Sequence, residues 1–115
     1  MLRKTTLMAG LASLFLSTPV QAVELQILVL PDAYFPQTSY VTAGDTLVFL
    51  NESDVAITVT SVDDQWTTGA LGNNQSSTIT VVAGMTTDFF HEGSEDENGE
   101  PAVTGIISFI DAPLD

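Results

Sequence analysis

The sequence predicts an all-β sandwich of the Greek-key type, with about seven strands in one domain. Two observations lead to this prediction. Short runs rich in Val, Ile, Thr and Phe recur along the chain, and Gly, Asn, Asp and Pro separate them. After the first 22 residues, no segment has the apolar period of a helix. There is no cysteine, so a domain of this size must rely on a packed core rather than on disulfides.

Residues 1–22 have the composition of a secretory signal peptide. The basic start "MLRK" precedes the apolar stretch "LMAGLASLFL", and "PVQA" then places small residues at the cleavage positions. The alternative is a membrane anchor, but a span needs roughly 20 apolar residues and this stretch is shorter. We therefore predict cleavage after Ala22 and a domain of residues 23–115. It would be exported to the periplasm or the extracellular space, with no stable membrane insertion.

The first strands are predicted from apolar runs and their breaks. "ELQILVLP" is a strand that ends at Pro31, because proline has no backbone N–H to give to a sheet. "SYVTAGDTLVFLN" contains a short strand, a Gly-Asp turn and a clear strand from Thr46 to Leu50. In "VAITVTSV", larger apolar residues alternate with small or polar residues, which predicts a strand with one buried face. Val55, Ile57 and Val59 would form its apolar face, and Ala56, Thr58 and Thr60 would form the other, largely polar face.

The second half of the chain supplies a long connection and three more strands. "SVDDQWTTGALGNNQS" begins at Ser61 and is too long and polar for a hairpin turn, so it is predicted to be the crossing connection of a Greek key. Trp66 and Leu71 would fold back onto the edge of the sandwich, although a surface role of Trp66 in contacting a partner stays open. The remaining strands are in "SSTITVV", "AGMTTDFF" and "VTGIISFI".

The charge of the chain restricts its partners. There are 15 Asp and Glu residues but two basic residues, Arg3 and Lys4, and both belong to the predicted leader. After cleavage the 15 carboxylates would face no Lys or Arg at all, which gives a formal charge of −15. Phosphate binding needs basic side chains, so nucleic acid is excluded as a partner. A basic protein or a cation is favoured.

In this order, the segments resemble those of the cupredoxins, small secreted copper proteins typified by plastocyanin and azurin. The resemblance extends from about Glu24 to Ile110. "YFPQTSYVTAGDTLVFLNES" is similar to the early strand pair of that family, with its Ala-Gly-Asp-Thr turn. "ITVTSVDDQWTTGALGNNQSSTITV" is similar to the next strand and its Asp-rich connection. "VVAGMTTDFF" and "VTGIISF" are similar to the last two strands, which in the family enclose the copper-binding loop.

The resemblance implies a copper site whose ligands are missing here. A blue copper site uses two imidazoles and a thiolate, with a weak axial donor that is usually Met. The four positions fall on Ile57 for the first histidine, His91 or Phe90 for the cysteine, Ser94 for the second histidine and Val103 for the methionine. Met85 lies at the wrong end of its strand to replace the axial donor. Without a thiolate, type 1 copper is ruled out, and electron transfer becomes the last of the function hypotheses.

His91 is the first candidate for a functional residue. Together with Glu92, Glu95 and Asp96 it could bind copper or another divalent cation, because imidazole and carboxylate groups suit such metals. The plainer interpretation is a lone, half-exposed histidine at the end of a strand, whose charged form nearby carboxylates favour.

The acidic segment "HEGSEDENGE" is the second candidate. Its oxygen donors could hold calcium, although their spacing differs from that of the known Asp-rich calcium loop. Alternatively it is a solvated run of charges, or a surface that docks a basic protein partner. The carboxylates for such docking are Glu95, Asp96, Glu97 and Glu100.

Nucleophilic or acid–base catalysis has little support in the sequence, although a carboxylate pair such as Asp63 and Asp64 could in principle do acid–base work. Ser94 and Ser108 lie in no nucleophile-elbow pattern, and the neighbouring Asp63 and Asp64 are explained as turn residues. We therefore predict a protein that is not an enzyme, with no certain cofactor. The first hypothesis is an exported binding module that docks a basic partner through residues 91–100. The second is a metal-handling protein that uses His91 and nearby carboxylates.

Overall fold

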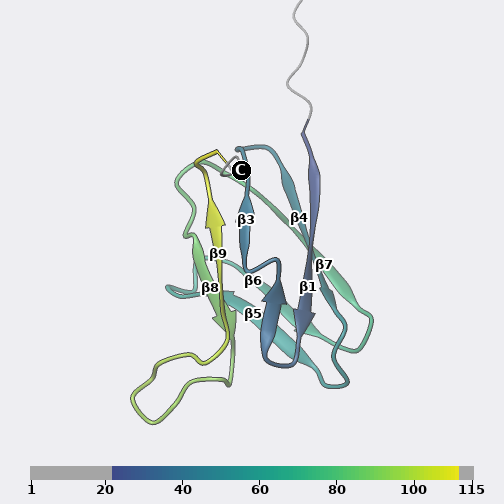
Figure 1. Cartoon of the computed structure of the whole chain (residues 1–115), viewed down its shortest axis with the longest axis vertical. Helices are drawn as coiled ribbons and strands as arrows, with labels where there is room; N and C mark the ends of the chain where they lie inside the picture. Colours follow the sequence, from purple (N-terminus) through teal and green to yellow (C-terminus); the bar gives the residue numbers. More distant parts are fainter. Residues whose placement is uncertain (1–21, 112–115) are drawn as a thin grey trace, which may run out of the picture.

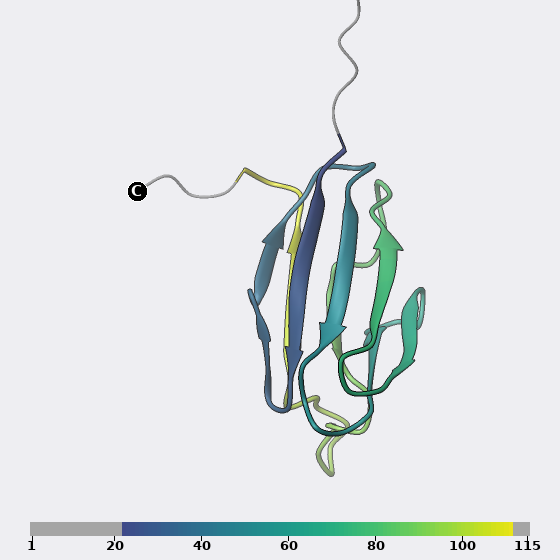
Figure 2. The same ribbon diagram turned by 90° about the vertical axis from the view of Figure 1, so that its right-hand side faces the viewer.

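Nine strands form two facing sheets in the computed structural model, which describes residues 22–111. The first sheet has the order β2-β1-β4-β7 and the second has the order β3-β9-β8-β5-β6 (Figures 1 and 2). The strands are β1 (Glu24–Leu30), β2 (Ala33–Phe35), β3 (Thr38–Tyr40), β4 (Thr46–Asn51), β5 (Ile57–Ser61), β6 (Thr67–Leu71), β7 (Ser76–Thr80), β8 (Asp88–His91) and β9 (Thr104–Ser108). The described residues contain no helix, so the predicted all-β sandwich is confirmed.

The predicted leader lies outside the described residues except for Ala22, and its cleavage therefore stays a prediction. In the part of the chain that the structure describes, no helix has the length and apolar character needed to cross a membrane.

Two strands were not expected from the sequence. Strand β2 has only three residues, and it pairs with β1 as an antiparallel hairpin in which Phe35 lies opposite Leu28. Strand β6 occupies part of the predicted crossing connection and pairs with β5, so that Leu71 lies opposite Ile57. The crossing to the first sheet is therefore confined to the short segment between β6 and β7. The predicted segment therefore does cross between the sheets, but it also contains β6, which the sequence did not reveal because a Thr- and Gly-rich edge strand lacks an apolar pattern.

The sheets are mixed rather than purely antiparallel. Strand β1 pairs with β4 in parallel, and β3 pairs with β9 in parallel. The reason is that the chain leaves the first sheet after β2, contributes β3 to the second sheet, and then returns as β4 beside β1 (Figure 1). All other strand pairs are antiparallel.

The predicted turn before β4 is present, but the predicted face of β5 needs a correction. Gly44 has a φ of 101°, and the buried Asp45 accepts hydrogen bonds from the backbone N–H groups of Thr42 at 2.8 Å and Val23 at 3.0 Å. Val55, expected on the apolar face, is 58% exposed and precedes β5. Its carbonyl accepts a hydrogen bond from the side chain of Asn51, which holds Val55 in a turn.

The core between the sheets is organised around aromatic rings. Phe89 lies at its centre, with ring centroids 4.8 Å from Tyr34, 5.4 Å from Phe49 and 5.7 Å from Trp66. Trp66 packs against this core while its indole N–H donates to the Thr86 carbonyl at 2.9 Å. Leu71 is also buried. The predicted inward placement of Trp66 and Leu71 is therefore confirmed.

Ser39 of β3 provides a first test of the packing. Its hydroxyl is buried, and it has no hydrogen-bond partner among the described residues. An unpaired buried polar group costs about 1–3 kcal/mol, so Ser39→Ala should raise the free energy of unfolding by about 1 kcal/mol in urea titrations. The neighbouring Thr38→Ala serves as the control and should change it by less than about 0.5 kcal/mol. A clear loss of stability in Ser39→Ala would contradict this prediction.

Candidate functional site

The acidic loop, residues 91–100, begins at the end of β8, forms most of the connection to β9 and projects from one end of the sandwich (Figure 1). Its two arms are held together, since Glu95 and Pro101 form a β-bridge and the Asp96 N–H donates to the Glu100 carbonyl at 2.9 Å. Gly93 and Gly99 have φ values of 90° and 82°, which side chains with a Cβ rarely adopt. Hydrogen bonds within the loop therefore hold its backbone in place, and the carboxylates extend from this backbone.

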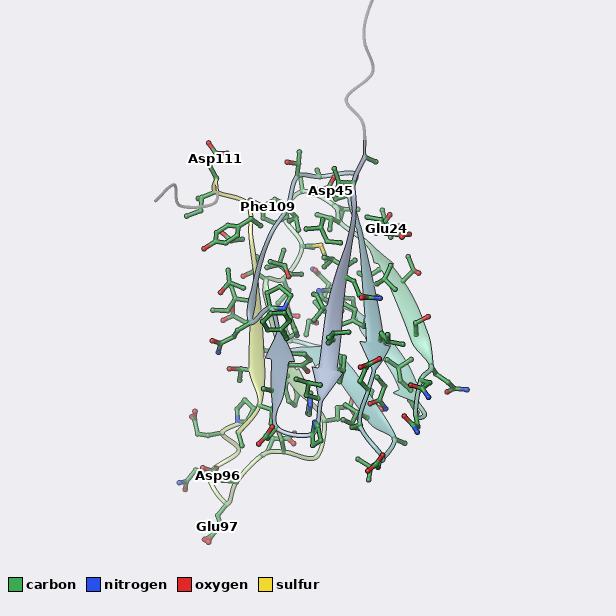
Figure 3. All side chains as sticks on the ribbon, turned by 45° about the vertical axis from the view of Figure 1, so that its right-hand side comes forward. Glu24, Asp45, Asp96, Glu97, Phe109 and Asp111 are labelled. Atoms are coloured by element: carbon green, nitrogen blue, oxygen red, sulfur yellow. The ribbon has the colours of Figure 1, made fainter. Side chains whose placement is uncertain are left out.

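The four carboxylates that the sequence assigned to docking play different parts. One oxygen of Asp96 accepts the backbone N–H groups of Asn98 at 2.8 Å and Glu100 at 2.9 Å, so this side chain builds the loop. Glu95 accepts the Gly93 N–H at 2.7 Å with one of its two oxygens. The exposed carboxylates of Glu97 and Glu100 accept no hydrogen bond from the described residues. In Figure 3, Asp96 and Glu97 mark the far end of the molecule from Glu24 and Asp111.

His91 is buried, with 5% of its surface exposed, so the expectation of a half-exposed histidine was wrong. Its Nε2 atom lies 2.8 Å from the Leu30 carbonyl and its Nδ1 atom lies 2.6 Å from the Tyr34 hydroxyl. A carbonyl can only accept, so the neutral imidazole donates from Nε2 and accepts the Tyr34 O–H at Nδ1. His91 on β8 thus connects the second sheet to β1 and β2 of the first.

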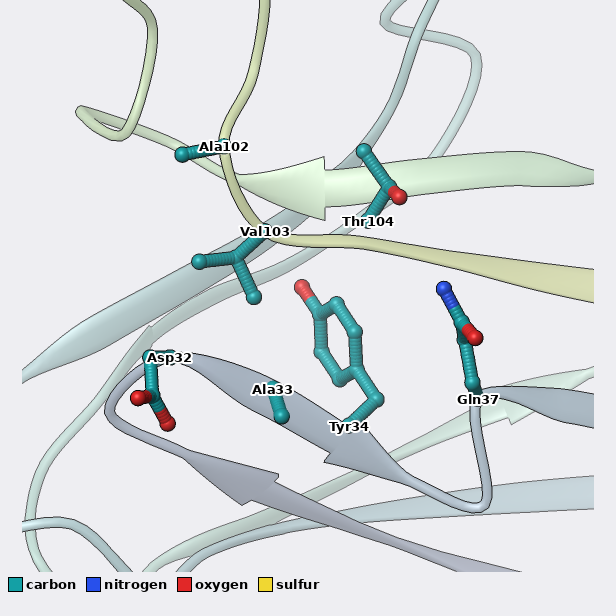
Figure 4. Close-up of a pocket in the computed structure, with 7 residues that line it drawn as sticks. All are labelled: Asp32, Ala33, Tyr34, Gln37, Ala102, Val103 and Thr104. Atoms are coloured by element: carbon teal, nitrogen blue, oxygen red, sulfur yellow. The ribbon is translucent and has the colours of Figure 1, made fainter.

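A pocket of about 210 Å³ lies beside this histidine–tyrosine pair (Figure 4). Strand β2 and the start of β9 form its walls, and Tyr34 extends between Val103 and Thr104. The lining residues are Asp32, Ala33, Tyr34, Gln37, Ala102, Val103 and Thr104. Sequence reasoning missed Tyr34 because β2 itself was not recognised.

The predicted metal ligands are not brought together. Both ring nitrogens of His91 have partners, and Glu92 accepts the Thr60 hydroxyl at 2.6 Å. Glu95 and Asp96 accept backbone N–H groups within the loop. Within residues 22–111, no three His, Cys, Asp or Glu side chains are grouped in a way that could hold a metal ion. The arrangement therefore fits neither the calcium site nor the His91-centred site considered from the sequence.

The copper site that the resemblance implies is not supported by these residues either. Ile57 and Val103 belong to the buried hydrophobic core, and the Ser94 hydroxyl donates to the backbone carbonyl of His91 at 2.8 Å. The chain has no thiolate and no second imidazole. Hydrocarbon packing and hydrogen bonds thus occupy the positions where copper ligands would be expected.

Asn51 is the centre of a second buried polar cluster at this end of the sandwich. Its side-chain amide donates to the carbonyls of Val55 at 2.8 Å and Leu71 at 2.7 Å. Its side-chain oxygen accepts the backbone N–H of Ser53 at 2.8 Å and the Ser53 hydroxyl at 2.7 Å. The cluster ties the end of β4 to the end of β6, and hence the first sheet to the second.

Asp63 and Asp64 act as turn residues, which agrees with the interpretation from the sequence. The Asp63 carboxylate accepts the hydroxyls of Thr86 and Ser61, and the Thr86 hydrogen bond is the main cause that lowers the pKa of Asp63. Asp64 has a φ of 63° in the same turn. That the domain has no catalytic activity stays a prediction.

Comparison with solved structures finds chains with a similar fold. The Cu-containing nitrite reductase (NirK) from Thermus scotoductus SA-01 superposes with a TM-score of 0.61 over 89% of this chain. The fold is cupredoxin-like. The cupredoxin-like domain corresponds to 25% of the length of that reductase and shares 16% sequence identity with it, so the likeness concerns the fold alone. No protein-family model and no curated protein sequence matches the chain.

The buried His91 makes the stability of the cupredoxin-like domain depend on pH. Burial lowers the pKa of His91, and the Leu30 carbonyl and the Asp32 carboxylate oppose this effect only in part. As the pH falls below about 6.5, the unfolded chain therefore binds a proton before the folded chain does. The stability that neutral His91 provides is present above about pH 6.5 and is lost as the pH falls toward the lowered folded-state pKa.

We expect the free energy of unfolding to decrease between about pH 7.5 and pH 5.5, and to decrease less in His91→Gln. Glutamine keeps a donor and an acceptor but does not titrate. Urea titrations at constant ionic strength measure the free energy of unfolding of both proteins under the same electrostatic screening. Equal decreases in the two proteins would show that His91 is not the group that takes up the proton.

Proposed function

We propose that this cupredoxin-like domain is an exported, non-catalytic binding module that docks a basic protein through the acidic loop, residues 91–100. The observation that supports this proposal concerns the carboxylates of Glu97 and Glu100. Both carboxylates extend from a loop whose backbone is fixed by its own hydrogen bonds, and neither accepts a hydrogen bond from the described residues. The chain has no Lys or Arg after Lys4 that could neutralise them.

The physical consequence is a negative field without basic side chains to offset it, to which the five carboxylates of the loop contribute at one end of the domain. Such a field attracts a basic partner over about one Debye length, which is roughly 10 Å at 0.1 M salt. Because the loop backbone is already ordered, docking would not have to order it, which reduces the entropic cost of binding. Charge complementarity of this kind mainly sets the rate of association and the choice of partner.

The test uses a synthetic peptide of alternating arginine and glycine as the probe. In NMR titrations, the largest amide shifts should lie in residues 91–101, and the affinity should fall as sodium chloride is raised. The double variant Glu97→Gln/Glu100→Gln should weaken binding by about threefold to tenfold, as expected for two exposed charge pairs.

A matched control removes the same number of charges from the opposite end of the molecule. Glu24→Gln/Asp111→Asn changes two carboxylates that lie away from the acidic loop (Figure 3). This control should bind the peptide nearly as well as the unchanged protein. If both double variants weaken binding equally, the peptide responds to net charge alone, and docking through the loop is refuted.

A further inference from the structure

A cleft of about 260 Å³ lies between the acidic loop and the outer face of the second sheet. Phe90 of β8 contributes to its floor, at a position paired with Thr60 of β5 and Thr104 of β9. The cleft is lined by Val62, Phe90, Glu95, Gly99 and Pro101. The sheet and the loop therefore both contribute to one concave surface, which the sequence did not reveal.

The lining combines apolar groups with one carboxylate. Val62 is 53% exposed and Phe90 is partly buried, so neither is fully covered by the rest of the domain. Glu95 uses one oxygen to accept the Gly93 N–H at 2.7 Å, and its second oxygen accepts no hydrogen bond from the described residues. The β-bridge between Glu95 and Pro101 holds this wall in place.

A second carboxylate is anchored close to the same floor. Glu92 accepts the hydroxyl of Thr60 at 2.6 Å, and Thr60 is the direct cross-strand neighbour of Phe90. An aromatic ring with carboxylates nearby attracts a cation, because the face of the ring carries partial negative charge. Arginine suits such a surface better than lysine does, since its planar guanidinium both stacks on rings and pairs with a carboxylate through two hydrogen bonds.

We propose that this cleft receives an arginine side chain of the basic partner, with the aliphatic stem and guanidinium against Phe90 and the charge paired with Glu95. The inference rests on the proposed docking function and names the group that the partner inserts. A second copy of the mature domain cannot supply this group, because residues 23–115 contain no Lys or Arg. The partner is therefore a different protein.

The test compares three synthetic peptides in which glycine alternates with arginine, lysine or citrulline. The arginine peptide should bind about threefold to tenfold more tightly than the lysine peptide, and the neutral citrulline peptide should not bind measurably. Phe90→Leu should abolish the preference for arginine over lysine while keeping salt-dependent binding. NMR should show contacts between the arginine side chain and the Phe90 ring.

Phe35→Leu is the matched control, because it makes the same change at a phenylalanine of the first sheet that is 67% exposed. It should leave the arginine preference unchanged. Equal binding of the arginine and lysine peptides, or a preference that survives Phe90→Leu, would overturn the cleft inference while leaving loop docking in place. If no cationic peptide shifts residues 91–101 in a salt-dependent way, the docking function itself fails. Amide spectra of each variant verify that it is folded.

Discussion

Phe89→Ala should lower the free energy of unfolding by about 3–5 kcal/mol, which is a large part of the stability of a small domain. The ring is fully buried, and it contacts Tyr34, Phe49 and Trp66. Alanine would remove the group on which the other three rings pack and leave a cavity between the sheets. Urea titrations monitored by Trp66 fluorescence measure the change.

Gly105 allows a double-variant test of the packing around Phe89. It lies directly opposite Phe89 on the neighbouring strand, and a Cβ atom built there would collide with the Phe89 ring and approach Tyr34. Gly105→Ala alone should therefore cost about 1–3 kcal/mol, whereas the same change should cost much less when Phe89 is already Ala. Phe35→Ala, at an exposed ring, is the control. If the losses in unfolding free energy of Phe89→Ala and Gly105→Ala simply add in the double variant, the contact between the two positions is refuted.

Asn51→Asp should lower the free energy of unfolding by about 3 kcal/mol or more at neutral pH. The Asn51 amide donates to two carbonyl oxygens, those of Val55 and Leu71, and the residue is fully buried. Aspartate would replace the donor with a charged oxygen that faces both carbonyls. Thermal and urea unfolding, compared with the unchanged protein at each pH, measure the effect.

The effect of Asn51→Asp should decrease at acidic pH, because a protonated carboxyl group can donate one of the two lost hydrogen bonds. Asn74→Asp is the control, since Asn74 is an exposed turn residue. A similar loss of stability in the two variants would mean that the Asn51 cluster adds nothing beyond the charge change.

The parts of the fold that the sequence predicted are those with a strong local pattern. Strand β4 alternates buried and partly buried residues along Thr46–Asn51, and its apolar run is clear in the sequence. Strand β2 has three residues between two prolines, and β6 is rich in Thr and Gly, so neither has an apolar period of its own. Their existence depends on pairing with β1 and β5, which a local pattern does not encode.

The candidate site was predicted only in outline. The acidic loop can be recognised in the sequence from its run of Asp and Glu residues. The sequence does not show that Asp96 accepts backbone hydrogen bonds within the loop while Glu97 accepts none from the described residues. The burial of His91 depends on Tyr34, which is 57 positions away in the chain. The cleft beside Phe90 arises where the loop lies near the outer face of the sheet, and no local motif marks it.

The parallel pairing of β1 with β4 and of β3 with β9 has a consequence for the speed of folding. Neither pair can start from a tight hairpin, and β3 must find a partner near the far end of the chain. Long loops must close before these contacts stabilise the chain, so we expect folding on the order of milliseconds to seconds rather than microseconds.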